Sequence, residues 1–281
     1  MGVRIEADGL VMTYGPVVAA DGVSFTVEPG EFFGLLGPNG AGKTTTLEMV
    51  EGLRKPQAGS VTIDGQEPWR RDPSLQRRMG VQLQSSSFFE RLTAREQLTT
   101  FGALYGVPKE RSDELLGQVG LADKADDRTE DLSGGQKQRL SIACALVHEP
   151  DVVFLDEPTA ALDPQARRNL WDLLRGLNDS GRTVVLTTHY MDEAEALCDR
   201  VGIMDHGRIL ELDTPAALVR GLDAPVHITV VTDGVENTIE TREPARVLAE
   251  LAARDELDGL SVKGASLEDV FLELTGRQYR A

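Results

Sequence analysis

Cysteine and aromatic residues are scarce in this chain of 281 residues. It has only two cysteines, Cys144 and Cys198, and 5% of its residues are aromatic. The two cysteines lie far apart and lack C-x-x-C spacing. The pattern therefore favours two buried thiols over a disulfide or a metal site.

Long apolar runs are also missing, since none approaches the ~18 residues that a membrane-spanning helix needs. The first residues lack the apolar stretch of a signal peptide, and Glu6 stands where a myristoylation signal has Ser or Thr. We therefore expect a soluble, cytoplasmic protein that reaches a membrane only through a partner.

Positive charge is in short supply, with 29 Lys and Arg against 46 Asp and Glu. The net charge of −17 disfavours sequence-independent nucleic-acid binding, which needs a basic surface. Hydrophobic residues make up 41% of the chain, which is ample for a packed core. The length suits one large domain and a smaller one.

Residues 37–44, GPNGAGKT, fit the phosphate-loop pattern G-x-x-x-x-G-K-[ST]. The mostly apolar residues 31–36 before the loop predict a buried strand, and residues 44–50 after it predict a helix. Backbone N–H groups of such a loop surround phosphate oxygens, and the positive end of the following helix favours the same anion. Lys43 would reach the β- and γ-phosphates, and the Thr44 hydroxyl would bind Mg²⁺.

Two carboxylates end the apolar stretch 151–155, which predicts a buried parallel strand. Ligands of open α/β sheets bind at the carboxyl ends of strands, so Asp156 would hold Mg²⁺ and Glu157 would lie near the γ-phosphate. The alternative is simple solvation of two charges at a strand end. Residues 183–188 predict another core strand, which ends at His189; this histidine is either structural or in contact with the γ-phosphate.

Tyr14 and Ser133 each have a structural and a functional interpretation. Tyr14 lies some twenty residues before the phosphate loop and either stacks on a nucleotide base or belongs to the core. Ser133 precedes two glycines and a long helical pattern, so it predicts a helix N-cap. The N–H groups of such a helix start also form an anion site, and the two roles are compatible.

The rest of the chain suggests separate structural parts. Alternation in residues 3–7 and 23–27 predicts a half-exposed antiparallel sheet, and residues 93–122 predict helices. The composition changes near residue 220. Beyond it, a strand at 226–231 and helices at 244–254 and 266–276 predict a small α+β unit, the last helix capped by Ser266 and ended by Gly276.

Together these motifs resemble the ATP-binding subunit of an ATP-binding-cassette (ABC) transporter over about residues 3–220. The phosphate loop, Gln84, the signature LSGGQ, the 151–157 strand, Asp163 and His189 stand in the family's order. The signature consists of Leu132, Ser133, Gly134, Gly135 and Gln136. Ala160-Ala161 departs mildly from the more usual Ser-Gly. The tail SLEDVFLELTG resembles daunorubicin-resistance-type exporter ATPases, which work with ABC-2-type permeases.

The resemblance implies an α/β fold: a P-loop NTPase, RecA-like core with an antiparallel β subdomain and a helical signature subdomain at about 88–148. Residues 1–220 would form the ABC ATP-binding domain, and residues 221–281 a C-terminal accessory α+β appendage.

It also implies roles for single residues. Glu157 would be the base that polarises water, His189 the switch on the γ-phosphate, and Gln84 the residue that senses Mg²⁺ and faces the permease. Tyr14 would stack on adenine, and Asp163 would lie in the loop that crosses the dimer. The nucleotide-binding residues would be Tyr14, Gly37, Pro38, Asn39, Gly40, Ala41, Gly42, Lys43, Thr44 and Thr45, and the Mg²⁺ ligands Thr44, Gln84 and Asp156.

The partners implied are a second copy of the chain, bound head to tail across ATP, and an ABC-2-type permease at the inner face of the cell membrane. The permease would select a drug-like or lipid-like substrate. A soluble ABC ATPase of DNA repair or translation is the alternative. The segment between Lys43 and Ser133 is too short for the coiled coil of repair proteins, and the chain has one cassette instead of two. An importer ATPase would differ only in its permease, and the tail argues against it.

Overall fold

The computed structural model describes residues 2–82, 88–89, 91–160, 162–222, 224–232, 235–252 and 259–276. The chain divides into two compact units, residues 1–212 and 213–281. The sequence predicted a division at 220/221. The structural division falls earlier because α8 (Pro215–Gly221) packs against α10 (Leu267–Thr275) in the second unit.

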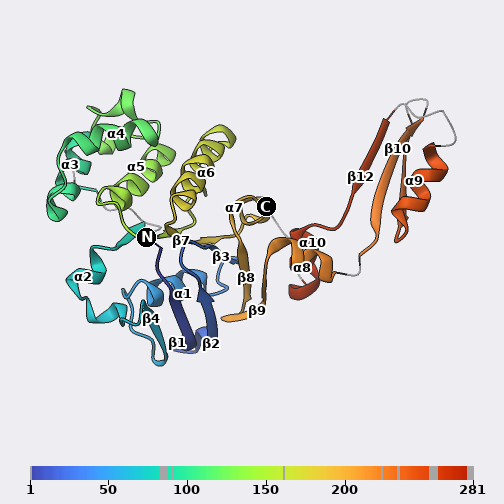
Figure 1. The fold of residues 1–281 in the computed structure, drawn as a ribbon, viewed down its shortest axis with the longest axis horizontal. Helices are drawn as coiled ribbons and strands as arrows, with labels where there is room; N and C mark the ends of the chain where they lie inside the picture. The colour runs from blue at the N-terminus through green and yellow to red at the C-terminus, as the bar shows by residue number, and fades with distance from the viewer. Residues whose placement is uncertain are drawn as a thin grey trace. The chain divides into compact units, whose positions relative to one another are not determined.

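A six-stranded sheet forms the centre of the first unit, with strand order β5-β6-β7-β3-β8-β9 (Figure 1). The strands are β3 (Phe32–Leu36), β5 (Met79–Gln82), β6 (Val152–Asp156), β7 (Thr183–Thr188), β8 (Arg200–Asp205) and β9 (Arg208–Asp213). Strands β5, β6, β7, β3 and β8 pair in parallel. Strands β3, β6 and β7 are buried throughout, which explains their nearly continuous apolar sequences.

A second, antiparallel sheet has the order β2-β1-β4. Its strands are β1 (Ile5–Tyr14), β2 (Val17–Val27) and β4 (Ala58–Ile63). Buried and exposed residues alternate along β1, so the expected half-exposed antiparallel sheet is confirmed. Phe25 of this sheet stacks on Phe33 of the central sheet with ring centroids 5.0 Å apart. The two sheets therefore share one hydrophobic core.

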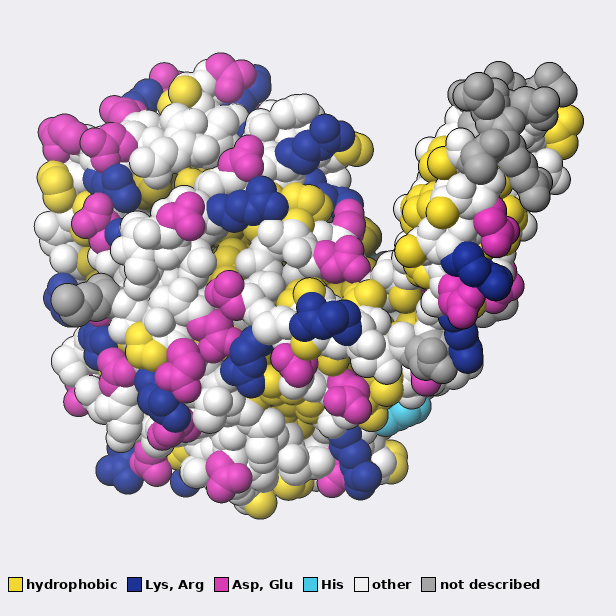
Figure 2. Space-filling model, turned by 45° about the vertical axis from the view of Figure 1, so that its right-hand side comes forward, with side chains coloured by type: hydrophobic (Ala, Val, Ile, Leu, Met, Phe, Trp, Pro, Cys, Tyr) yellow, Lys and Arg dark blue, Asp and Glu magenta, His cyan; other side chains and the backbone are white. Residues whose placement is uncertain are grey.

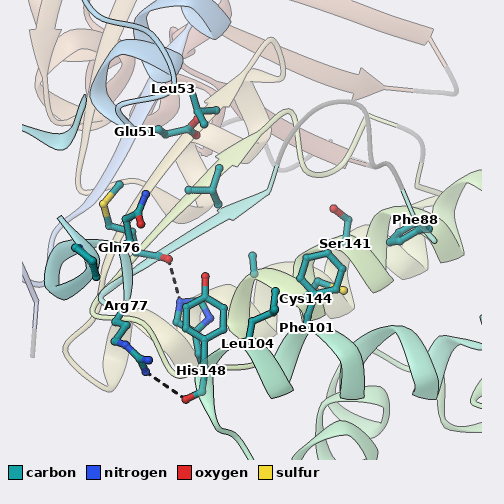
Figure 3. Close-up of a pocket in the computed structure, with 15 residues that line it drawn as sticks. Glu51, Leu53, Gln76, Arg77, Phe88, Phe101, Leu104, Ser141, Cys144 and His148 are labelled. Carbon is teal, nitrogen blue, oxygen red and sulfur yellow. Dashed lines mark hydrogen bonds between the residues drawn. The ribbon is translucent and has the colours of Figure 1, made fainter. Parts of the chain in front are cut away.

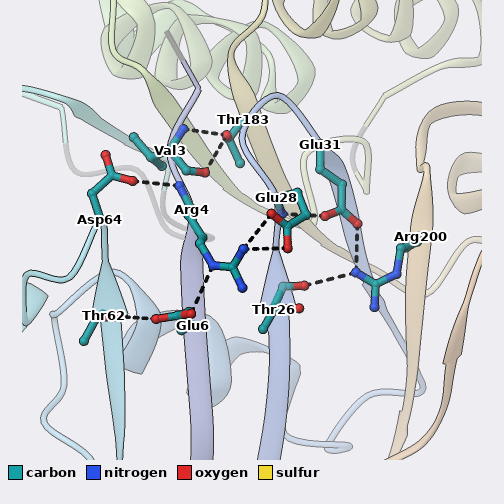
Figure 4. Close-up of polar contacts among 10 residues, drawn as sticks. All are labelled: Val3, Arg4, Glu6, Thr26, Glu28, Glu31, Thr62, Asp64, Thr183 and Arg200. Atoms are coloured by element: carbon teal, nitrogen blue, oxygen red, sulfur yellow. Dashed lines mark hydrogen bonds and ion pairs between the residues drawn. The ribbon is translucent and has the colours of Figure 1, made fainter.

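Polar contacts at the start of the chain also join the two sheets (Figure 4). The Val3 backbone N–H donates to the Thr183 hydroxyl at 2.9 Å, and that hydroxyl donates back to the Val3 carbonyl. Arg200 of β8 donates to the Thr26 carbonyl of β2 at 3.2 Å and lies 3.3 Å from Glu31. These contacts satisfy polar groups that the junction between the sheets would otherwise bury unpaired.

Helices α3 (Ala94–Tyr105), α4 (Glu110–Gln118) and α5 (Gly134–Leu146) gather into one group (Figure 1). They fall within the range 88–148 predicted for a helical subdomain. Thr93 and Ser133 each form a capping box at the start of α3 and α5, which confirms Ser133 as an N-cap. Gly106 ends α3 in the left-handed conformation. A 3-10 turn, η3 (Thr129–Asp131), precedes α5.

The remaining elements of the first unit connect these layers. They are α1 (Lys43–Val50), η1 (Pro68–Arg70), α2 (Pro73–Gln76), η2 (Ala122–Lys124), α6 (Pro164–Asp179) and α7 (Met191–Leu197). The turn between β8 and β9 has positive φ at both His206 and Gly207, as a two-residue hairpin turn requires. Cys144 and Cys198 are both buried free thiols, as expected.

The second unit contains a three-stranded antiparallel sheet of order β11-β10-β12. Its strands are β10 (Val226–Thr232), β11 (Val235–Thr241) and β12 (Gly259–Lys263), and α9 (Pro244–Ala252) packs on one face. Ser266 caps α10 and Gly276 ends it, which confirms the sequence prediction. The sequence analysis missed α8, β11 and β12. Strands β11 and β12 are mostly exposed and so lack a strong apolar pattern.

Acidic and basic side chains are interspersed on the face shown in Figure 2, where the described Lys and Arg lie among Asp and Glu. None of the helices in the described ranges is both long and apolar enough to cross a membrane.

Candidate functional site

The phosphate loop follows β3 and leads directly into α1. Gly42, the residue before α1, has a φ of 102°, and a Cβ built there would lie 2.0 Å from the Ala19 carbonyl oxygen. A Cβ on Gly37 would lie 2.3 Å from the Met204 carbonyl oxygen. Both positions therefore require glycine for conformational or steric reasons. The tight turn leaves the first N–H groups of α1 without intrahelical partners, which is the arrangement of an anion site.

Lys43 is 4% exposed, and its Nζ is held by the loop and by one carboxylate. It donates to the carbonyl oxygens of Gly37 at 2.8 Å and Pro38 at 3.2 Å, and lies 3.3 Å from Glu157 Oε1. Burial lowers the pKa of Lys43, whereas the neighbouring Glu157 and Asp156 act in the opposite direction. The ammonium therefore lies at the carboxyl edge of the sheet, beside the end of β6.

Asp156 is the last residue of β6 and is 3% exposed. Its Oδ1 accepts a hydrogen bond from the Thr44 hydroxyl at 3.2 Å and another from the Thr187 hydroxyl. Burial raises the pKa of Asp156, and these two hydrogen bonds oppose that change. A buried carboxylate beside a hydroxyl is the kind of oxygen-donor set that a hard divalent cation prefers.

Glu157 is held in place on both sides by β7 and by His189. Its backbone has a φ of 47°, which is uncommon for a non-glycine residue, and its N–H donates to Thr187 Oγ1 at 3.1 Å. His189 Nδ1 lies 3.3 Å from Glu157 Oε2. The hydrogen bond with His189 lowers the pKa of Glu157, burial opposes this change, and Lys43 supports it. A strained backbone and a charged carboxylate in one residue are typical of a functional site.

Tyr14, at the end of β1, is 41% exposed and is therefore not a core residue. The Arg54 guanidinium lies 5.2 Å from the centroid of its ring. The exposure of Tyr14 excludes the alternative in which its ring is packed in the core. The exposed ring is able to stack on a planar ligand.

The contacts of Ser133 and Asp163 are local. Ser133 Oγ accepts from the Gln136 N–H at 3.3 Å, and the Ser133 N–H donates to Gln136 Oε1 at 2.8 Å. Asp163 Oδ1 accepts from the N–H groups of Gln165 at 3.0 Å and Ala166 at 2.8 Å. Both residues are exposed and both begin a helix. The structure thus brings Lys43, Thr44, Asp156, Glu157 and His189 together, while Tyr14, Ser133 and Asp163 are exposed.

Gln84 lies outside the described residues, so its expected role stays a prediction. Thr187 and Glu51 belong to the surroundings of the site and were missed by the sequence analysis. Thr187 was seen only as part of an apolar strand. Glu51 follows α1 and is 6% exposed, and its Oε1 has no hydrogen-bond partner among the described residues. Burial raises the pKa of Glu51 well above its usual range, and the charges of Asp156 and Glu48 add to that effect.

Glu51 also lines a cavity of about 620 Å³ in the first unit (Figure 3). Helices α3 and α5 form one side of it, and α2, β5 and the end of α1 form the other. Phe88, Phe101 and Leu104 are among its apolar lining residues, with His148 stacked on Tyr105 at a ring-centroid distance of 3.9 Å. Phe89 is 56% exposed and its ring centroid is 6.3 Å from that of Phe101.

The fold and this site define a class of protein, the P-loop ATPases. Residues 20–160 match the family model described as "ABC transporter". The chain therefore belongs to the ABC transporter family, as an ATP-binding and ATP-hydrolysing cassette.

Particular relatives cover nearly the whole chain. A linearmycin resistance ATP-binding protein of Bacillus subtilis is 35% identical, over 98% of this chain and 99% of the relative. A Nod factor export ATP-binding protein of Paraburkholderia xenovorans is 42% identical, over 98% of this chain and 97% of the relative. The daunorubicin/doxorubicin resistance ATP-binding protein of Streptomyces peucetius is 37% identical, over 97% and 92%.

Solved structures show the same likeness. A dimeric ATP-binding cassette in a post-hydrolysis state with ADP and Pi is 28% identical, with a TM-score of 0.69, over 75% of this chain and 98% of that one. An ATP-binding subunit of an ABC transporter is 26% identical, with a TM-score of 0.72, over 96% and 99%. The P-loop ATPase fold expected from the sequence is thus confirmed.

Replacement of Glu51 by Gln is expected to stabilise the protein at alkaline pH. Because the pKa of Glu51 is raised in the native state, native Glu51 keeps a proton above its usual value of 4.5 that the unfolded chain has released. Wild-type stability therefore falls as the pH rises through this interval, by about 1.4 kcal/mol per unit of pKa separation. The neutral amide of the variant carries no such penalty.

Melting temperatures of wild type and Glu51→Gln between pH 4.5 and 8.5 would measure this difference. The variant should gain on the wild type as the pH rises, and the gap should close toward pH 4.5. Glu211→Gln, at an exposed position of β9, is the matched control and should follow the wild type. Parallel curves for Glu51→Gln and wild type would show that Glu51 is ionised in the native state.

Proposed function

We propose that two copies of this chain hydrolyse ATP in a head-to-tail dimer and thereby drive an exporter whose permease is of the ABC-2 type. The observation that carries the proposal is the buried cluster in which Lys43, Glu157 and His189 meet at the end of the central sheet. Three relatives whose names state resistance or export support the transport direction.

ATP binding would begin with an exchange of partners at Lys43. Its Nζ now donates to two loop carbonyls, which are weaker partners than phosphate oxygens. The β- and γ-phosphates would take their place, surrounded by N–H groups of residues 39–45. Tyr14 would stack on the adenine ring. The low solvent exposure of Lys43 strengthens its attraction to the phosphates, since little water screens the charge.

The residues at the end of β6 fit Mg²⁺. Asp156 and Thr44 supply oxygen ligands that already lie 3.2 Å apart, and a carboxylate that is 3% exposed favours a compensating cation. Gln84 is the third proposed ligand. When bound, Mg²⁺ would neutralise charge that develops on the β- and γ-phosphate oxygens.

Glu157 would accept the proton of the attacking water as the bond between the γ-phosphorus and the ADP oxygen breaks. His189 and Lys43 keep this carboxylate ionised and oriented, because both lie 3.3 Å from its oxygens. With the imidazole Nδ1 facing Glu157, Nε2 would be the atom that contacts the γ-phosphate. Thr187 fixes the backbone of Glu157, so the base is aimed before the substrate arrives.

The dimer would complete each site with the signature of the other copy. Ser133 and the glycines after it begin α5 at an exposed position, where the N–H groups of the two glycines would be offered to an anion. Asp163 would lie along the boundary between the two copies. Because neither half-site surrounds the γ-phosphate alone, ATP would hold the dimer closed and hydrolysis would release it.

Replacement of Glu157 by Gln is expected to preserve ATP binding and to lower the ATPase rate by roughly 10²–10⁴-fold, because the amide cannot accept a proton from water. Phosphate release and gel filtration with ATP would measure the effect, and the variant should accumulate as an ATP-bound dimer. Glu211→Gln is the control. An ATPase rate near wild type would remove Glu157 from the role of base.

Shared sites predict complementation between two inactive variants. In Lys43→Ala dimers the phosphate loop fails at both sites, and in Ser133→Arg dimers the signature fails at both. A mixed dimer combines the intact loop of one chain with the intact signature of the other. Random mixing should therefore restore up to about a quarter of the wild-type ATPase rate, since half of the dimers are mixed and each has one of two sites. Variants that stay inactive in the mixture, or that hydrolyse ATP alone, would contradict the shared-site arrangement.

The permease is proposed to dock at the cavity lined by Phe88, Phe101 and Leu104. The exposed Phe89 beside this cavity suits an interface, because aromatic residues often anchor protein–protein contacts. The permease would hold the chain at the inner face of the cell membrane and would select the substrate, which we expect to be drug-like or lipid-like.

Replacement of Phe89 by Asp is expected to release the protein from membranes that contain its permease, because a charge replaces an apolar contact. Co-sedimentation with such membranes would measure release. The melting temperature should change little, since the side chain is exposed. Leu210→Asp, at an exposed apolar position on β9, should stay bound. Retention of Phe89→Asp on the membranes would place the dock elsewhere.

A further inference from the structure

Tyr190 and Arg167, which have no role in the proposed function, lie next to one another beside His189. The ring centroids of His189 and Tyr190 are 4.1 Å apart, with the planes inclined by 39°. The Arg167 guanidinium carbon lies 4.4 Å from the centroid of the Tyr190 ring. Arg167 belongs to α6, and Tyr190 immediately precedes α7. A continuous series of contacts, called the stack below, therefore runs from Arg167 of α6 through the Tyr190 ring to His189 and ends at Glu157.

The stack starts one turn into α6, close to the loop proposed to cross the dimer. The Arg167 backbone N–H donates to the Asp163 carbonyl at 2.9 Å, so Asp163 and Arg167 occupy successive levels of the same helix end. Pro164 between them fixes the backbone at the first helical position. A displacement of Asp163 would therefore carry Arg167 with it, since the first turn of a capped helix moves as one piece.

The guanidinium is confined from other sides as well. Arg167 Nη1 lies 3.7 Å from Asp192 Oδ2, and Arg167 is one of the groups whose charge acts on the buried Glu193. Glu193 Oε1 in turn accepts a hydrogen bond from Trp171 Nε1 at 3.2 Å. A cation–π contact, an ion pair and a partly buried hydrogen bond thus join α6 to α7 and its N-cap Tyr190.

We propose that Tyr190 and Arg167 are positioning residues for ATP hydrolysis: Arg167 holds the Tyr190 ring against His189, so that the imidazole is aimed at Glu157 only when α6 is in place. This inference rests on the proposed function. It makes α6 the link by which closure against the second copy of the chain orders the base. Cations over aromatic faces and close ring contacts both favour one orientation of the rings.

The proposal separates the chemical step from ATP binding. Among the described residues, the Tyr190 ring packs against His189 and Arg167. Loss of these contacts should therefore leave ATP affinity within about twofold of wild type. The ATPase kcat should fall about tenfold in Tyr190→Leu, which keeps apolar volume but has no ring face, because a misoriented His189 misplaces the reacting groups. Tyr190→Phe keeps the ring and should retain the wild-type rate.

A double-mutant cycle would test whether Tyr190 acts through His189. His189→Ala lowers the rate by itself, and adding Tyr190→Leu should lower it no further, because the ring then has nothing to orient. If Tyr190→Leu lowers the ATPase rate by the same factor in the wild type and in His189→Ala, Tyr190 acts independently of His189. That result would overturn the proposal.

Arg167→Ala provides the second variant, and Arg175→Ala its matched control. Both arginines lie on α6, and Arg175 also reaches the α7 region, where it donates to the Ala196 carbonyl at 2.9 Å. Arg167→Ala should lower kcat about threefold, whereas Arg175→Ala should leave kcat unchanged. Melting temperatures of both variants would show any general loss of stability. Equal kcat values for Arg167→Ala and Arg175→Ala would overturn the role of Arg167. A wild-type chain without ATPase activity would overturn the proposed function as well, whereas equally active wild type and Tyr190→Leu would overturn only the positioning role.

Discussion

The pairing of Lys43 with Glu157 in a nearly dry environment is the interaction on which the rest of the site depends. A buried ammonium needs a compensating charge, and Glu157 Oε1 supplies it at 3.3 Å. The same carboxylate contacts His189 through its other oxygen. Glu157 therefore compensates the charge of Lys43 and orients His189. Its removal would take from both side chains the carboxylate that they share.

The strand order of the central sheet makes this pairing possible. Strand β7 lies between β3 and β6, so the phosphate loop after β3 and the carboxylates after β6 meet across the end of β7. Thr187 at that end contacts both Asp156 and Glu157, and the Thr188 carbonyl accepts from the Gly37 N–H at 3.2 Å. A parallel sheet aligns these ends at one edge, which is where ligands of open α/β sheets bind.

The sequence was sufficient to predict features written in short, contiguous patterns. The phosphate loop, the capped helix after Ser133 and the buried strands around Asp156 and His189 each combine a local pattern with a strong physical reason. It was not sufficient for contacts between distant segments. Arg167 and Tyr190 are separated in the chain and ordinary in composition, and only the packing of α6 on α7 brings them together. The burial of Glu51 likewise depends on tertiary structure, because a Glu at the end of a helix usually faces water.

The helix caps at the proposed dimer surface also explain how one residue serves both the fold and a ligand. Ser133 Oγ accepts the Gln136 N–H, so its hydroxyl proton remains available to donate to a phosphate oxygen. Asp163 accepts two N–H groups with Oδ1, which leaves Oδ2 for a partner. Each capping side chain accepts N–H groups of its own helix and still has a hydroxyl proton or a second carboxylate oxygen for a partner. Helix ends are stable in the separate chain for this reason, and dimer closure can add contacts there without breaking the bonds that hold the helices.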